Sequence, residues 1–233
     1  MKRVFLGGLV GFVFALQSIM FGQGPPKSAT YLTKEQIDAV NKTPGVDRTL
    51  MVWDLGKIQY SVGMIHRGPS AAAARGAAGA AGGAAPGGGA AAAGGRGAGG
   101  GAARGPATPC GEQASTPPSG GAPGMISHDF QTEGYLITSG GGTLVTGGHI
   151  VNGTKSAPDA EVTKILNGPS CSGTAVGSDI VRKVVKVGDV IVIPAGVPHG
   201  WIDITDHVDY LSFRPIVEKE LQPGYVNPNM PKN

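Results

Sequence analysis

Short stretches in which apolar and polar residues alternate recur along the chain, and this spacing is typical of β-strands. Residues 47–55 and 58–67 are joined by a turn at 55–57, and the second stretch places Tyr60, Val62, Met64 and His66 on one face. Further strands are expected at residues 134–138, 143–146, 181–186, 190–193, 199–204 and 208–214. Glycine and proline separate them at 139–142, 187–189 and 194–196. Many short strands with tight turns predict an all-β sandwich or barrel.

The chain has one strong helix signal, before the first strand. Thr33 and Gln36 have the spacing of a capping box, which predicts a short helix ending near Asn41, before Pro44-Gly45. Residues 147–179 are expected to form a long connection with one short helix near 159–166. Residues 223–233 are expected to form an irregular tail.

A low-complexity segment interrupts the strand pattern. Between Ala71 and Gly105, 31 of 35 residues are alanine or glycine, and no collagen-like period is present. Glycine costs about 1 kcal/mol relative to alanine at each helical position and interrupts every alanine run. Residues 68–124 are therefore predicted to be a disordered insertion between residues 25–67, with the helix and first strands, and residues 125–222, the barrel core.

The N-terminus has the pattern of a secretory signal. Lys2 and Arg3 precede an apolar stretch at residues 4–16, and small and polar residues then lead into Pro25-Pro26. We expect residues 1–24 to be a signal peptide cleaved near Gly22 to Gly24. The apolar stretch is shorter than the ~20 residues of a membrane span. The chain is therefore expected to be exported to a periplasmic or extracellular location, without a membrane span once the signal is removed.

Charge and cysteine content bear on nucleic-acid binding and on disulfide formation. The net charge is +3, of which Lys2 and Arg3 contribute two, so no basic surface for nucleic acid is indicated. The two cysteines, Cys110 and Cys171, form either a disulfide or two free thiols, and an oxidising compartment would permit the disulfide.

Two groups of residues have the composition and spacing of a metal site. The first runs from His128 through Glu133 to Gly140, and the second comprises Gly188, Pro194, Gly196, His199 and Asp203. These residues resemble the two motifs of the cupin superfamily, G-x5-H-x-H-x3-4-E-x6-G and G-x5-P-x-G-x2-H-x3-N. The resemblance covers about residues 125–214. It departs at Ile126, which stands where the first motif has a histidine, and at Asp203, which stands where asparagine is usual.

The resemblance implies a single jelly-roll barrel with His128, Glu133 and His199 as ligands of one divalent metal. Because residues five apart on a strand face opposite sides, His128 and Glu133 converge only if residues 129–132 form a turn. Two imidazoles and a carboxylate suit Fe, Mn, Ni, Zn or Cu. The alternative is a barrel of the same type that no longer binds metal.

Other residues are candidates for the surroundings of the ion. His66 is a candidate fourth ligand or a strand-end histidine bonded to the backbone. Arg67 either holds a substrate carboxylate or is solvated, and Tyr135 and Trp201 either line the pocket or belong to the core. His149 and His207 are not assigned to the site.

Three classes of function follow. The first is a metal-dependent enzyme of oxygenase or isomerase type acting on a small organic molecule. The second is a non-catalytic protein that binds a small ligand, and the third is a cell-surface protein whose Gly/Ala segment is the functional part. The resemblance also implies a homodimer.

Overall fold

The computed structural model describes residues 25–70, 107–116 and 118–232. The predicted signal peptide and most of the Gly/Ala segment lie outside the described residues. The elements are α1 (Lys34–Asn41), β1 (Asp47–Asp54), β2 (Gln59–Arg67), β3 (Pro109–Cys110), β4 (Ala122–His128), β5 (Glu133–Thr146), β6 (His149–Lys155), the π-helix η1 (Val162–Leu166), β7 (Ser170–Val176), β8 (Val181–Lys186), β9 (Val190–Ile193), β10 (His199–Ile202) and β11 (Val208–Ile216).

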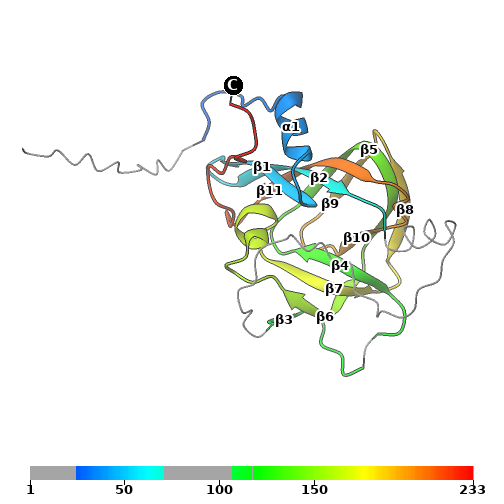
Figure 1. Ribbon diagram of the computed structural model, residues 1–233. Helices are drawn as coiled ribbons and strands as arrows, with labels where there is room; N and C mark the ends of the chain where they lie inside the picture. The colour runs from blue at the N-terminus through cyan, green and yellow to red at the C-terminus, as the bar shows by residue number, and fades with distance from the viewer. Residues whose placement is uncertain (1–24, 71–106, 117, 233) are drawn as a thin grey trace, which may run out of the picture.

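The molecule is built from antiparallel strands, as the alternating pattern predicts (Figure 1). Strands β1, β2, β11, β5 and β9 form one side, and β3, β6, β7, β4, β10, β5 and β8 form the other. Strand β5 belongs to both sides because it pairs with β11 and β9 in its first half and with β10 and β8 in its second. The fold is all-β, and its interior lies between these two sides.

Strand β5 bends near its middle and is one continuous strand. The sequence instead predicted two strands separated by a turn at residues 139–142. Gly140 has a φ of 64°, and a Cβ there would lie 2.0 Å from the carbonyl oxygen of His207. A glycine in a left-handed conformation bends the strand at this close approach without ending it.

The connection predicted for residues 147–179 is wrong in part, because this segment contains the strands β6 and β7. The short helix expected near residues 159–166 is present as η1. The glycines of this segment allow close packing: a Cβ on Gly153 would lie 2.7 Å from the sulfur of Cys171. The described chain also resumes at residue 107, and β3 and the start of β4 fall inside the predicted insertion. Strands therefore occupy part of the segment that the composition predicted to be disordered.

Helix α1 forms where the capping box predicts it, with the Thr33 side chain and the Gln36 side chain bonded reciprocally to backbone groups. It packs over the outer face of β1 and β2, where Val40, Leu50, Val62 and Met64 form a buried cluster. The predicted tail at 223–233 crosses the edge of β1, and Asn227 bonds to the backbone of Leu50 and Thr49. Both features cover the outer side of the first sheet.

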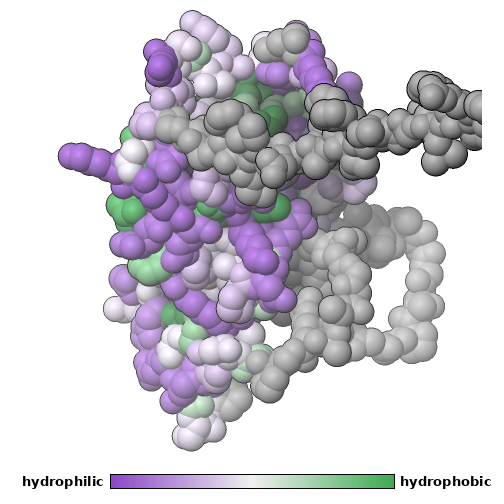
Figure 2. Space-filling view, turned by 90° about the vertical axis from the view of Figure 1, so that its left-hand side faces the viewer, coloured by the Kyte–Doolittle hydropathy of each residue, from purple (hydrophilic) through white to green (hydrophobic). Residues whose placement is uncertain are grey.

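A disulfide joins Cys110 of β3 to Cys171 of β7. Among the described residues, no helix is both long enough and apolar enough to cross a membrane. In the space-filling view of Figure 2 hydrophilic residues predominate on the visible face, and hydrophobic residues form small separate patches. The buried apolar side chains include an interior cluster that contains Ile65, Tyr135 and Tyr210.

Candidate metal centre

The three candidate ligands lie at the ends of strands that meet in the interior. His128 is the last residue of β4, Glu133 the first of β5 and His199 the first of β10. Residues 129–132 separate β4 from β5, so the turn required for His128 and Glu133 to converge is present. The Pro194–Gly196 turn is attached to β4, because the Gly196 amide donates to the His128 carbonyl at 2.7 Å.

The ligand atoms lie at the distances that one ion would require. Glu133 Oε2 is 3.1 Å from His199 Nε2 and 3.4 Å from His128 Nε2. The three ligand atoms lie within 4.8 Å of one another. Atoms bound about 2.1 Å from one ion lie about 3.0 Å apart at a right angle and about 3.4 Å apart at the tetrahedral angle. The spacing therefore fits a single first-row metal ion.

The second nitrogen of each imidazole has a hydrogen-bond acceptor, so Nε2 is the nitrogen without a proton when the ring is neutral. His199 Nδ1 lies 3.0 Å from the Val197 carbonyl oxygen, which can only accept, so Nδ1 carries the proton. His128 Nδ1 lies 2.8 Å from Ser170 Oγ, and that hydroxyl donates its own proton to the Gly168 carbonyl. Ser170 must then accept from His128. In the neutral rings both Nε2 atoms therefore direct their lone pairs toward the Glu133 carboxylate.

The remaining carboxylate oxygen of Glu133 is held by a buried arginine. Arg214 Nε lies 3.1 Å from Glu133 Oε1, and Ser212 donates to the same oxygen at 3.2 Å. The Arg214 guanidinium also pairs with Asp47 at 2.6 Å. Tyr135 donates to Oε2 at 2.6 Å. These contacts fix the orientation of the carboxylate, with Oε2 toward the two histidines.

The net effect of burial and neighbouring charges is to lower the pKa of both His128 and Glu133. Burial lowers the pKa of His128, and the facing Glu133 only partly opposes this shift. For Glu133, burial alone would raise the pKa, but His128 and Arg214 outweigh it and hold the pKa of this carboxyl well below its usual range. Two imidazoles and one carboxylate form the donor set of a divalent transition-metal site.

An aromatic wall continues from the three ligands toward Arg67. The rings of Tyr135 and His199 are 6.4 Å apart, those of Tyr135 and Tyr210 4.3 Å, and those of Tyr210 and Trp201 5.4 Å. Arg67 Nε donates to the Tyr210 hydroxyl at 3.1 Å. The indole N–H of Trp201 is buried without a hydrogen-bond partner among the described residues. Tyr135 thus belongs to the interior cluster, Trp201 packs against it, and Arg67 contacts the same wall.

His66 lies apart from this cluster, contrary to its proposed role as a fourth ligand. Its ring pairs with Asp209 at 2.6 Å and stacks on His207. The strand alternates, so Arg67 points inward with Ile65 while His66 points outward, and its side chain is 45% exposed. His149 is also distant from the cluster, since it pairs with Glu112 at the surface.

Ile126, which occupies the position of the missing histidine, pairs directly with His199 across β4 and β10. An aliphatic side chain offers no ligand atom there. Within the described residues, the group of ligating side chains therefore comprises His128, Glu133 and His199 alone. Such a three-residue set leaves coordination positions open for other ligands.

Sequence reasoning did not identify Ser170, Tyr210 or Arg214, which support or extend the site. Two of them lie on β11, where Val208, Tyr210, Ser212, Arg214 and Ile216 are the buried positions. Strict alternation across the predicted strand at 208–214 would have placed Arg214 inside. Ser170 lacked any such signal because its strand was predicted as a connection.

Comparison with known proteins adds little to this geometry. No protein-family profile and no curated protein matches the sequence. The solved structures with similarity include an oxalate oxidase in complex with glycolate, with 12% identity, a TM-score of 0.30 and coverage of 77% of this chain and 55% of that chain. Peruvianin-I, a cysteine peptidase from Thevetia peruviana latex, has 12% identity, a TM-score of 0.32 and coverage of 90% and 88%. The chain thus spans only about half the length of the oxalate oxidase.

Proposed function

We propose that this chain is an exported cupin-type protein that holds one divalent transition-metal ion on His128, Glu133 and His199. The observation that carries the proposal is the convergence of three buried lone-pair atoms within 4.8 Å. Two of these atoms are histidine nitrogens whose protons are engaged elsewhere. When both rings are neutral, the three lone pairs repel one another unless a cation lies between them. The two cupin-like motifs supply all three residues.

The donor set favours a metal of the first transition row. Imidazole nitrogen suits Fe, Mn, Ni, Zn and Cu, and the carboxylate lowers the net charge of the site. When bound, such an ion polarises an oxygen of a coordinated molecule. The chain's own contribution is to orient the ligands, through Ser170 for His128 and Arg214 for Glu133.

We further propose that the ion is presented to a small organic acid. Arg67 supports this proposal because its Nε contacts Tyr210 in the aromatic wall beside the site. The guanidinium keeps its charge, because burial alone would lower its pKa but the interaction with Tyr210 raises it overall. A fixed cation in a partly buried wall favours a carboxylate over a neutral ligand. A binding protein and an enzyme would use this arrangement equally, and turnover with a panel of acids would distinguish them.

A spectroscopic titration tests ligand binding at the ion. The protein is loaded with Co²⁺, and its visible absorption is followed as acetate or the neutral analogue acetamide is added. Acetate should perturb the spectrum at lower concentration than acetamide, and Arg67→Gln should weaken acetate binding about tenfold while the metal is retained. Arg182→Gln, an exposed change on β8, is the matched control. Equal responses to both ligands, or no effect of Arg67→Gln, would remove the organic acid from the proposal.

Export is supported by the basic and apolar N-terminal pattern and by the disulfide, since disulfides persist in oxidising compartments. Expression of the full chain with its own N-terminus provides the test. We expect the protein in the periplasmic or culture fraction, with a new N-terminus near Gly22 to Gly24. Recovery from the cytoplasm with Met1 intact would contradict export.

A further inference from the structure

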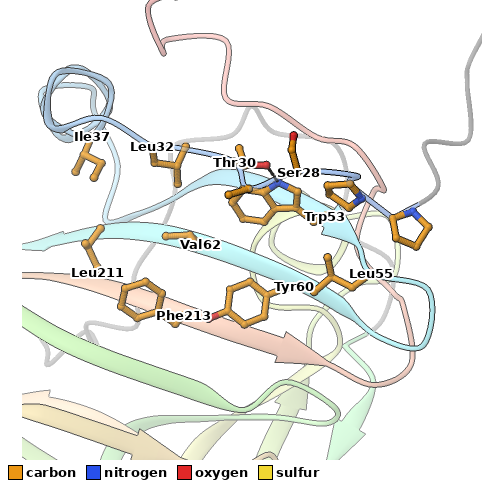
Figure 3. A pocket seen from close by; sticks show the side chains of 13 residues that line it. Ser28, Thr30, Leu32, Ile37, Trp53, Leu55, Tyr60, Val62, Leu211 and Phe213 are labelled. Carbon is orange, nitrogen blue, oxygen red and sulfur yellow. Dashed lines mark hydrogen bonds between the residues drawn. The ribbon is translucent and has the colours of Figure 1, made fainter.

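A hollow lies on the outer face of the first sheet, away from the metal centre. Its volume is about 590 Å³. Figure 3 shows its floor on β1, β2 and β11 and its far wall on α1 and the segment before it. The lining residues are Pro25, Pro26, Ser28, Ala29, Thr30, Leu32, Ile37, Trp53, Leu55, Tyr60, Val62, Leu211 and Phe213. We call this hollow the outer groove.

Alternation along β11 separates the outer groove from the metal centre. Leu211 and Phe213 point outward into the groove, whereas Tyr210, Ser212 and Arg214 between and beside them point inward. The same strand therefore serves two sites on opposite faces. A ligand in the outer groove would contact neither Glu133 nor the histidines.

The lining of the outer groove is aromatic and uncharged. The rings of Trp53 and Tyr60 are 6.4 Å apart, and Phe213 lies beside them in Figure 3. None of the thirteen lining residues is an acid, a base or a histidine. Burial raises the pKa of Tyr60, so its hydroxyl is neutral at physiological pH. This hydroxyl makes no hydrogen bond among the described residues, which leaves it free for a ligand.

The walls are held in place without a ligand. The Trp53 indole N–H donates to Thr30 Oγ at 3.1 Å, which attaches the segment before α1 to the sheet (Figure 3). Helix α1 is fixed by its capping box and by the Gln36 side chain, which donates to the Pro231 carbonyl at 3.1 Å. Preformed walls lower the ordering cost of binding.

From these features we infer that the outer groove binds an uncharged, apolar small molecule containing at least one ring. Ligand pockets of about 300–1,000 Å³ with apolar walls and a few polar groups are typical of small-molecule sites. A stable protein partner usually needs about 20–30 residues on each side, more than the groove provides. The absence of charge in the lining argues against an ionic ligand, because burying an unpaired charge is costly.

A pair of fluorescent probes tests the inference. Phenylnaphthylamine is uncharged, and anilinonaphthalene sulfonate differs from it by one sulfonate. Titration of the purified protein with phenylnaphthylamine should show saturable binding at one site. The sulfonated probe should bind about tenfold or more weakly, because the groove offers its charge no partner. Equal or tighter binding of the sulfonated probe would overturn the inference.

Substitutions locate the binding site. Leu211→Arg introduces a charge into the groove, and Ala29→Trp fills it from an exposed position that does not threaten the fold. Both should weaken phenylnaphthylamine binding about tenfold or more. Val184→Arg is the matched control, since Val184 is 76% exposed on β8 and outside the groove, and binding should be unchanged. Unchanged binding in Ala29→Trp, or equal losses in all three variants, would show that the probe binds elsewhere.

Light scattering during the titration separates a small-molecule site from a self-association surface. The molecular mass should stay constant as the probe binds. Dissociation of a dimer by the probe would show that a second copy of the chain occupies the groove, and would contradict the inference. Repeating the titration after removal of metal with a chelator should give the same affinity, which keeps this test independent of the metal centre.

Discussion

At the scale of single residues, the site depends on side chains that orient the ligands. Ser170 accepts from His128 and donates to Gly168, so it fixes the tautomer that exposes Nε2. Arg214 holds Glu133 Oε1 and leaves Oε2 toward the histidines. Loss of such an outer partner typically lowers metal affinity about 10- to 100-fold.

Ser170→Ala should reduce metal affinity about 10- to 100-fold, because His128 loses the partner that sets its tautomer. Ser172→Ala provides the control: it lies on the same strand with its side chain exposed, and should leave affinity unchanged. Competition with a chromophoric chelator measures both affinities. Equal affinities for the two variants would show that Ser170 does not orient the ligand.

Arg214→Met should destabilise the fold by about 3–5 kcal/mol, because it leaves the buried Glu133 without its cationic partner and removes the pair with Asp47. The same substitution at exposed Arg182 should change the free energy of unfolding by less than about 0.5 kcal/mol. Urea unfolding of the metal-free proteins provides the values. A small effect at position 214 would mean that the buried charges are solvated or rearranged.

At the scale of elements, the strands depend on glycines that allow close approach. Gly140 bends β5 between the two sheets, and a Cβ there would collide with the His207 carbonyl. Gly188 also has a positive φ, of 89°, but nothing lies within 4 Å of a Cβ built on it. Both positions require a left-handed backbone conformation, but only Gly140 lacks room for a Cβ atom.

Gly188→Ala should therefore lower the free energy of unfolding by about 1–2 kcal/mol, because alanine is strained in the left-handed conformation. Gly140→Ala should cost about 1–3 kcal/mol more, because the backbone must also shift to accommodate the methyl group. Thermal and urea unfolding of both variants make the comparison. Equal destabilisation would show that β5 adapts freely at its bend.

Alternation and glycine spacing were sufficient to predict β1, β2, β8, β9 and β11, and the capping box was sufficient to predict α1. The turn at residues 129–132 and the convergence of His128 with Glu133 were also predictable. Strands β6 and β7 were not, because glycine and serine in Gly153 and Ser170–Gly173 weaken the apolar alternation. Ladder hydrogen bonds and close packing against the disulfide stabilise them instead, and neither is visible in a local pattern.

At the scale of the whole molecule, the disulfide between Cys110 and Cys171 closes a sequence separation of 61 residues. It attaches β3, which follows the Gly/Ala segment, to β7 of the second sheet. The sequence left the pairing open, since two cysteines alone do not indicate their distance. The bond makes the stability of the second sheet dependent on oxidising conditions.

Replacing both cysteines by alanine should lower the free energy of unfolding by about 4 kcal/mol, the loop-entropy value for a crosslink of this length. Adding reductant should also lower the free energy of unfolding of the wild type, and should have no effect on the double variant. Urea unfolding with and without reductant provides the measurement. If reductant acts equally on both proteins, the effect does not come from this bond.

Metal content tests the central claim most directly. The purified protein, loaded with each candidate ion and passed through a desalting column, is analysed by mass spectrometry for bound metal. We expect about one ion per chain in the wild type and in His207→Ala, a surface histidine outside the cluster, and little in His199→Ala. A wild type that retains no metal, or a His199→Ala variant that retains as much as the wild type, would contradict the account.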